Sequence, residues 1–261
     1  TMSTVIYPSP IYGPVHSRRL GISLGINLLP ADGKSCTFDC IYCECGYNCN
    51  HRPHKRMPTR EEVAKGLEQK LMEMRAEGTL PDVLTFAGNG EPTSNPHFAE
   101  IIDDTIHLRD TYCPKAKISV LSNSTFAHHP KIHNALLKIE NNILKLDTVN
   151  ARYIDIVDRP QQKSFNVNDI IKHLKSFKGQ VIIQTIFMNG TTDAGIDICN
   201  TGDEYVQPWL NALTEIKPKA VMIYTIDRET PDRHLRKASK EELDRICNQV
   251  RSLGIPCTAS Y

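Results

Sequence analysis

Hydrophobic residues follow two patterns that alternate along the chain. Short runs rich in Val, Ile and Leu are separated by longer stretches in which apolar residues recur every three or four positions. The short runs end in polar residues or glycine, which is typical of buried parallel strands. These runs cover residues 20–29, 82–87, 117–122, 143–147, 180–187 and 220–227, and residues 255–260 would add an edge strand.

The longer stretches have the periodicity of amphipathic helices. Two of the expected helices begin with capping-box spacing, Thr59 with Glu62 and Ser239 with Glu242. We expect apolar faces at Val63, Leu67, Leu71 and Met74; at Phe98, Ile101, Ile102 and Thr105; at Ile170, Ile171, Leu174 and Phe177, before a stop at Gly179; and at Leu243, Ile246, Cys247 and Val250. Strict alternation of strand and helix predicts a parallel sheet with right-handed crossovers.

Six strand–helix units are too few for the standard eight-unit barrel. We therefore expect an α/β fold of the partial (β/α)6 TIM-like barrel type, with a parallel sheet and the site at the carboxyl ends of its strands. No Pro-, Gly- or Ser-rich linker divides residues 1–261, so one domain is expected. Residues 30–58 form a long loop without a predicted element, and such loops are usually functional.

Composition narrows the class of protein. The chain has 261 residues, 40% hydrophobic and 23% charged, as is usual for globular proteins. A net charge of +1 gives no overall attraction for nucleic acid. No apolar run reaches the roughly 18 residues of a membrane span, and the first residues lack the pattern of a secretory signal. We expect a cytoplasmic protein that does not contact a membrane.

Five of the nine cysteines lie between Cys36 and Cys49. So tight a cluster more often binds metal than forms disulfides. Iron–sulfur clusters normally have four thiolate ligands, so Cys36, Cys40 and Cys43 alone would leave one iron open to an exchangeable ligand. Two other interpretations stay open. The three thiols could be buried on one face of a helix, or they could hold structural zinc with Cys45, Cys49 or His51 as the fourth ligand.

The spacing Cys36-x3-Cys40-x2-Cys43, with the aromatic Tyr42 before the last cysteine, resembles the signature of the radical SAM superfamily. The resemblance implies that these cysteines hold a [4Fe–4S] cluster, which Tyr42 shields from water. It also implies that the open iron binds S-adenosylmethionine (SAM). Reductive cleavage of SAM would then yield a 5′-deoxyadenosyl radical that abstracts hydrogen from a substrate.

Further residues are candidates for SAM binding. Gly88, Asn89, Gly90 and Glu91 follow the second predicted strand and resemble the family's Gly-Gly-Glu motif, which binds the methionine amino group, although Asn89 departs from it. Asn123 and Asp147 follow the third and fourth strands and could face SAM or substrate, or could simply form caps and turns. Gln184 and Ile226 are weaker candidates for contacts with ribose and adenine.

Residues 14–21, 27–30 and 158–160 resemble one branch, the radical SAM proteins similar to the wyosine-synthesising tRNA enzymes. This chain lacks that branch's flavodoxin-like domain and N-terminal cysteine trio, and Lys145-Leu146-Asp147-Thr148 replaces Ser-Leu-Asp-Ala. A tRNA base or a small metabolite is therefore expected as substrate. Two basic segments could hold a phosphate-rich substrate or simply face water; they contain Arg52, His54, Lys55, Arg56 and Arg60, and Arg228, Arg233, His234, Arg236 and Lys237.

Together these features predict an enzyme of oxidoreductase or transferase type. An external low-potential electron donor, flavodoxin or ferredoxin, is implied because the chain shows no motif for a second electron carrier. The alternatives are a non-catalytic iron–sulfur or zinc module and a glycyl-radical activating enzyme.

Overall fold

The computed structural model describes residues 4–17 and 21–261, so Arg18, Arg19 and Leu20 of the first branch motif lie outside it. The strands are β1 (Ile11–Ser17), β2 (Gly21–Ile26), β3 (Val83–Phe86), β4 (Lys117–Ser122), β5 (Asn141–Lys145), β6 (Ile182–Ile186), β7 (Met188–Gly190), β8 (Ala220–Tyr224), β9 (Leu235–Lys237) and β10 (Cys257–Ser260). The helices are α1 (Arg60–Ala76), α2 (Phe98–Tyr112), α3 (Pro130–Leu136), α4 (Ala151–Val157), α5 (Val167–Lys175), α6 (Asp203–Ile216) and α7 (Lys240–Ser252), with a short 3-10 turn η1 (Pro92–Ser94).

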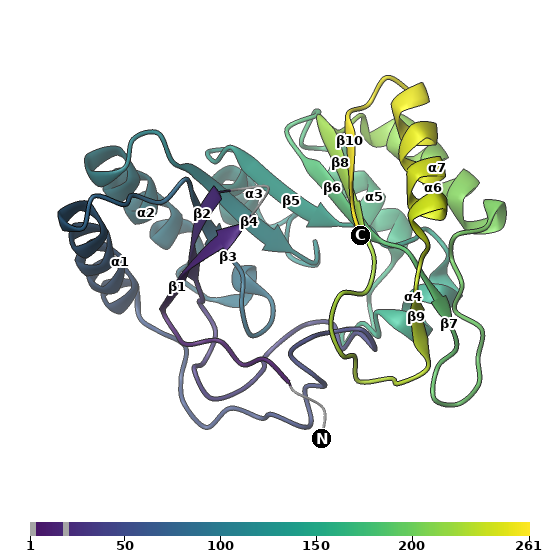
Figure 1. Cartoon of the computed structure of the whole chain (residues 1–261), viewed down its shortest axis with the longest axis horizontal. Coiled ribbons are helices and arrows are strands. Elements are labelled where there is room, and N and C mark those ends of the chain that lie inside the picture. Colours follow the sequence, from purple (N-terminus) through teal and green to yellow (C-terminus); the bar gives the residue numbers. More distant parts are fainter. Residues whose placement is uncertain (1–3, 18–20) are drawn as a thin grey trace.

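One large sheet organises the molecule. Its strand order is β1-β2-β3-β4-β5-β6-β8-β10. All neighbours from β2 to β10 are parallel, whereas β1 is antiparallel to β2. β1 and β10 stand at opposite ends of this order, so the sheet is open. Figure 1 shows a curved sheet with helices on its outer side, which confirms the expected partial barrel.

The predicted strands correspond to β2, β3, β4, β5, β6, β8 and the expected edge strand β10. The sequence reading missed β1, which contains Gly13 and Pro14 and has an irregular register between Tyr12 and Val15. It also missed β7 and β9, which form a separate two-stranded antiparallel sheet. Strands of three residues are too short to show a hydrophobic period.

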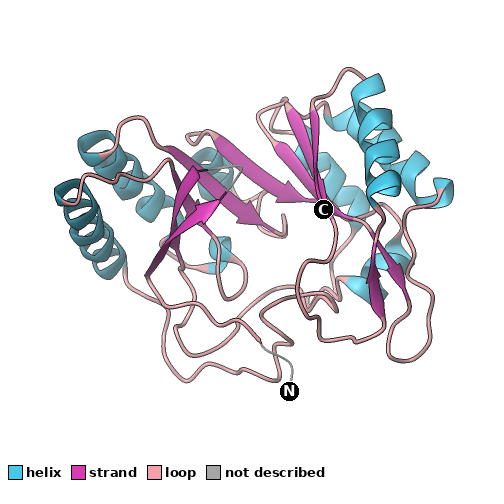
Figure 2. Ribbon diagram, in the orientation of Figure 1, coloured by secondary structure: helices cyan, strands magenta, loops and turns pink. Residues whose placement is uncertain are grey.

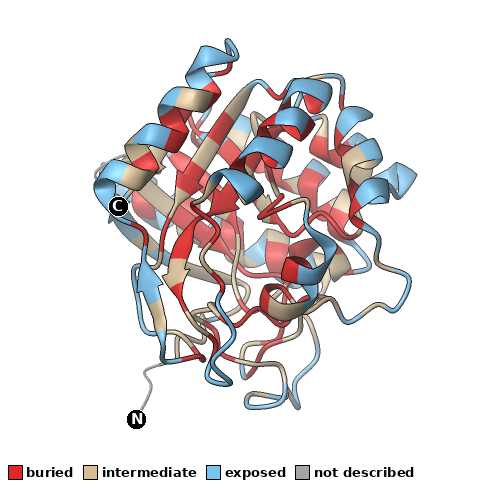
Figure 3. Ribbon diagram, turned by 90° about the vertical axis from the view of Figure 1, so that its right-hand side faces the viewer, coloured by how far each residue is buried: buried red, intermediate tan, exposed pale blue. Residues whose placement is uncertain are grey.

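Most residues of the expected helical faces are buried, but Ile171 is only partly buried and Phe177 lies beyond the end of α5. Val63, Leu67, Leu71 and Met74 pack inward from α1, and Leu243, Ile246, Cys247 and Val250 from α7. Ser239 and Glu242 form a complete capping box, and the Thr59 side chain caps α1. α5 ends at Lys175, earlier than the predicted stop at Gly179. Figure 3 shows buried residues on the inner sides of the helices and along the strands.

The lower edge of the molecule is built mainly from loops, as Figure 2 shows. Residues 27–59 contain no helix and no named strand. A small apolar cluster holds part of this loop in place, because Ile41 packs with Tyr153, Val157, Met188 and Ile198. None of the described helices is both long and apolar enough to cross a membrane.

Candidate functional site

A cavity of about 500 Å³ lies where the long loop meets the carboxyl ends of the parallel strands. Most of the site residues predicted from the sequence line it, namely Cys36, Cys40, Tyr42, Cys43, Gly88, Gly90, Glu91, Asn123, Gln184 and Ile226. Two predicted site residues, Asn89 and Asp147, are not among its described lining residues. The fold therefore gathers residues from five separate stretches of chain around one space.

The cysteine loop is held by backbone hydrogen bonds to the last residue of α4 and to the residue that follows it. Asp39 N–H donates to the carbonyl of Asp158 at 3.0 Å, and Ile41 N–H donates to the carbonyl of Val157 at 2.9 Å. Residues 158–160, singled out by the branch resemblance, thus lie next to the cysteines. No residue from 36 to 43 is helical, so the alternative of buried thiols on one helical face is wrong.

The glycine motif contacts the same loop directly. Ser35 N–H donates to the carbonyl of Asn89 at 2.8 Å, and Ser35 and Gly90 form a parallel bridge. Gly90 has a φ of +136°, and a Cβ at this position would lie 1.7 Å from the Ser35 carbonyl oxygen. Only glycine allows this close approach. The Asn89 side chain faces elsewhere and hydrogen-bonds the backbone of Tyr7 and Pro30.

Glu91 is almost fully buried and its carboxylate has a fixed position. It accepts hydrogen bonds from Ser122 Oγ at 2.8 Å, from Asn123 N–H at 2.7 Å, and from the Thr93 hydroxyl. Burial raises the pKa of Glu91, and these hydrogen bonds act in the opposite direction. A carboxylate positioned in this way at a cavity wall can accept a further hydrogen bond from an ammonium group.

Asn123 joins the glycine motif to the cysteine loop. Its Nδ2 donates to Thr37 Oγ1 at 2.7 Å and lies 3.6 Å from Cys36 Sγ. Its Oδ1 accepts hydrogen bonds from the backbone and hydroxyl of Thr125. The Asn123 side chain therefore makes its hydrogen bonds within the protein, and it lies beside Cys36, a predicted ligand of the cluster.

Tyr42 belongs to a buried polar network behind the cysteines. Its hydroxyl donates to Asp147 Oδ2 at 2.5 Å. Lys145 Nζ lies 3.0 Å from the Tyr224 hydroxyl and 3.4 Å from Asp147 Oδ1. Burial opposes the charge on Lys145, but Asp147 and Tyr224 outweigh it and raise the Lys145 pKa. Asp147 thus supports Tyr42 and Lys145 from behind the cavity wall.

The thiols lie in different electrostatic surroundings. Burial, together with the charge of Glu91, raises the pKa of Cys36 to about 12. Burial, together with Asp158, also raises the pKa of Cys40. The pKa of Cys43 falls to about 6, because Cys45 donates a hydrogen bond to it and the Lys34 ammonium attracts its charge. A thiolate ligand is thus most easily formed at Cys43.

The sequence reading missed Lys34 as a residue that lines the cavity, and it left the role of Cys45 open. Cys45 is buried and lies beside Cys43, whereas Cys49 is exposed. Lys34 stands two positions before the cysteine motif, and the spacing of the motif gives no signal for it. Within the two basic segments, Arg228 alone is among the described lining residues, and it pairs with Glu44 at 3.4 Å.

The donor set suits an iron–sulfur cluster. No three His, Cys, Asp or Glu side chains in residues 4–17 and 21–261 are placed around a single metal ion. In a cubane cluster each thiolate binds a different iron, so its ligands do not meet at one point. Three thiols that line one cavity, with an amide and an ammonium group beside their sulfurs, match what such a cluster requires.

Several curated proteins that are similar in sequence are described as UPF0026 proteins. No family model matches the chain. One from Helicobacter pylori strain J99 is 32% identical over 238 residues, covering 89% of this chain and 71% of that protein. Another, from H. pylori strain 26695, is 33% identical over 192 residues, covering 72% of this chain and 59% of that protein. The relative from Methanocaldococcus jannaschii is 27% identical, and the match covers 93% of this chain and 74% of that protein.

Several solved structures have a similar fold. A radical SAM methyltransferase from Sphaerobacter thermophilus has a TM-score of 0.69 at 17% identity, with 92% of this chain and 66% of that chain covered. SuiB from Streptococcus suis, bound to S-adenosylmethionine, has a TM-score of 0.63 at 15% identity, with 92% and 51% covered. TYW1 with a lysine–pyruvate adduct has a TM-score of 0.59 at 14% identity, with 88% and 73% covered. The radical SAM fold expected from the sequence is confirmed.

Proposed function

We propose that this chain, which belongs to the UPF0026 protein family, is a radical SAM enzyme. Cys36, Cys40 and Cys43 would hold a [4Fe–4S] cluster that leaves one iron free for SAM. When bound, the cluster and SAM would supply a 5′-deoxyadenosyl radical that abstracts a hydrogen atom from substrate. One observation carries the proposal: Ser35, next to the cysteine motif, is hydrogen-bonded to the glycine motif far away in sequence, and both motifs line one cavity.

The residues of this chain would bind and orient the cofactor. Glu91, held by Ser122 and Asn123, would accept a hydrogen bond from the methionine ammonium group. Gly88 and Gly90 line the cavity, so SAM would contact backbone there, and their lack of a Cβ makes room for Asn27 and Ser35 behind this wall. Tyr42 would cover the cluster and exclude water.

Gln184 from β6 and Ile226 after β8 line the same cavity, so they would contact the ribose and the adenine of SAM. An external low-potential donor, flavodoxin or ferredoxin, would deliver the electron that cleaves SAM. Gln184 lies in the middle of β6 and Ile226 lies two residues after the end of β8.

A small metabolite is favoured over a tRNA base as substrate by the charges around the cavity. Four acidic residues are among its lining residues beside three basic ones, namely Glu44, Glu91, Asp227 and Glu229 beside Lys34, Lys145 and Arg228. Arg228 already pairs with Glu44. A phosphate-rich chain would meet no net positive charge there, and tRNA binding depends on attraction of phosphates. Binding to tRNA that weakens steeply with salt would reverse this preference.

Anaerobic reconstitution with iron and sulfide tests the proposed function. The loaded protein, given dithionite and SAM, is expected to form 5′-deoxyadenosine. Cys40→Ala should lose the cluster and the product, whereas Cys113→Ala, which removes a buried thiol at the end of α2, should keep both. A loaded protein that forms no 5′-deoxyadenosine would contradict the proposal. So would a protein that binds zinc in place of iron, the result expected of a structural metal module.

A further inference from the structure

Lys34 is a buried lysine within the cysteine loop, with only 3% of its surface exposed. Lysine is rarely buried unless its charge is compensated. Its Nζ donates to the carbonyl of Gly46 at 2.6 Å and lies 3.6 Å from Asp39 Oδ1. Because residues 34 and 46 flank the cysteine motif, this side chain crosses the loop from one side to the other.

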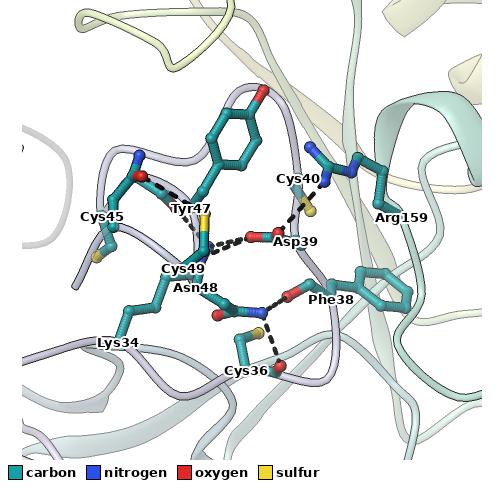
Figure 4. Close-up of polar contacts among 12 residues, drawn as sticks. Lys34, Cys36, Phe38, Asp39, Cys40, Cys45, Tyr47, Asn48, Cys49 and Arg159 are labelled. Atoms are coloured by element: carbon teal, nitrogen blue, oxygen red, sulfur yellow. Dashed lines mark hydrogen bonds and ion pairs between the residues drawn. The ribbon is translucent and has the colours of Figure 1, made fainter. Parts of the chain in front are cut away.

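The ammonium group of Lys34 faces the cysteines. It lines the cavity together with Cys36, Cys40 and Cys43. Figure 4 shows the Lys34 side chain in the loop that carries Cys36, Cys40 and Cys45. Its contacts with the Gly46 carbonyl and the Asp39 carboxylate are those of an ammonium group, which has three donors and no acceptor.

The charge of Lys34 is not cancelled by Asp39. The Asp39 carboxylate also pairs with Arg159, whose guanidinium lies 3.5 Å from Oδ2, and it accepts a hydrogen bond from Asn48 N–H at 2.8 Å. One carboxylate thus stands between two cations, so Asp39 compensates the charge of Lys34 only in part. Lys145 on the other side of the cavity differs, because Asp147 and Tyr224 contact its Nζ directly.

We propose that Lys34 is a positioning residue that makes the cluster of the proposed function easier to reduce. When an external donor gives up one electron, the cluster gains one negative charge and no covalent bond changes. A buried cation beside its ligands stabilises the reduced form more than the oxidised form. Lys34 would act through the cysteine ligands, without contact with substrate. The inference rests on the proposed function.

The test is a redox titration of the reconstituted protein, in which electron paramagnetic resonance measures the reduced cluster. At a fixed potential near the wild-type midpoint, Lys34→Met should lower the ratio of reduced to oxidised cluster by at least tenfold. Tenfold is the effect of a unit charge about 12 Å away at an effective dielectric constant of about 20, and a nearer charge acts more strongly. Lys34→Arg should restore most of the ratio, because it keeps the charge. Lys131→Met, at a surface lysine that is 84% exposed, should leave the ratio unchanged.

Asp39→Asn is the second variant, because it keeps the hydrogen bond from Asn48 and removes the anion beside Lys34. It should raise the ratio of reduced to oxidised cluster. An unchanged ratio in cluster-loaded Lys34→Met overturns the inference; if that variant binds no iron, an unchanged or lower ratio in Asp39→Asn overturns it. Failure of the proposed function looks different, because the wild-type protein itself would then hold no reducible cluster or would not cleave SAM.

Discussion

Replacing Tyr42 with Phe should destabilise the protein even when no cofactor is bound. The change removes one oxygen atom and keeps the ring. In the folded protein that hydroxyl donates a 2.5 Å hydrogen bond to Asp147, whose side chain is fully buried. Ile186 N–H and Lys145 Nζ would remain as donors, both to the other oxygen of the carboxylate. The variant therefore leaves a buried carboxylate with one strong donor fewer.

A hydrogen bond to a charged group contributes about 1.5–3 kcal/mol to stability. Removing the donor leaves a buried acceptor without that partner, which costs free energy because the acceptor is kept from water. The free energy of unfolding should thus fall by about 2 kcal/mol, which lowers the ratio of folded to unfolded protein by roughly 10- to 100-fold. No loss of packing adds to this figure, because Phe fills the same ring volume.

Urea unfolding of the apoprotein under reducing, anaerobic conditions measures this loss. Tyr112→Phe is the matched control, because the Tyr112 hydroxyl donates to Glu68 at 3.2 Å on the surface of the protein. The control should unfold at the wild-type urea concentration. If Tyr42→Phe lost no more stability than Tyr112→Phe, the buried network behind the cysteines would not contribute to folding as argued.

Two further predictions concern single residues. Gly90→Ala should prevent iron loading, because its Cβ would collide with the Ser35 carbonyl. Gly254→Ala is the control and should load normally, because Gly254 also has a positive φ but has open space around it. Iron and sulfide content after reconstitution measures the loading of both variants. Glu242 is partly buried, which disfavours its charge, but hydrogen bonds from Ser239, Thr201 and Asn189 outweigh this effect and lower its pKa to about 2. Its stabilising effect is therefore complete above its ordinary pKa of 4.5 and is lost as pH falls from there toward 2. Glu242→Gln should flatten the pH dependence of the urea midpoint in that range, and an unchanged slope would contradict this assignment.

Local sequence was enough to predict most of the fold. The apolar faces of α1 and α7 repeat with the period of a helix, and β3, β4 and β6 are short, nearly continuous apolar runs. Both patterns are visible without any tertiary contact. β1 could not be recognised in this way, because its residues are ordered by pairing with β2 and by an irregular register. Strand pairing depends on two segments, so the sequence of one segment alone does not reveal it.

The candidate site likewise has features that the local sequence determined and features that only the tertiary structure determined. The spacing of Cys36, Cys40 and Cys43 lies within one short stretch, and the sequence alone determined that these thiols would stand together. Tertiary structure decided what surrounds them. Tyr42 meets Asp147 across 105 residues, and Asn123 meets Cys36 across 87. Such partners are brought together by the order of strands in the sheet, and hydrogen bonds between them depend on distances that no local pattern encodes.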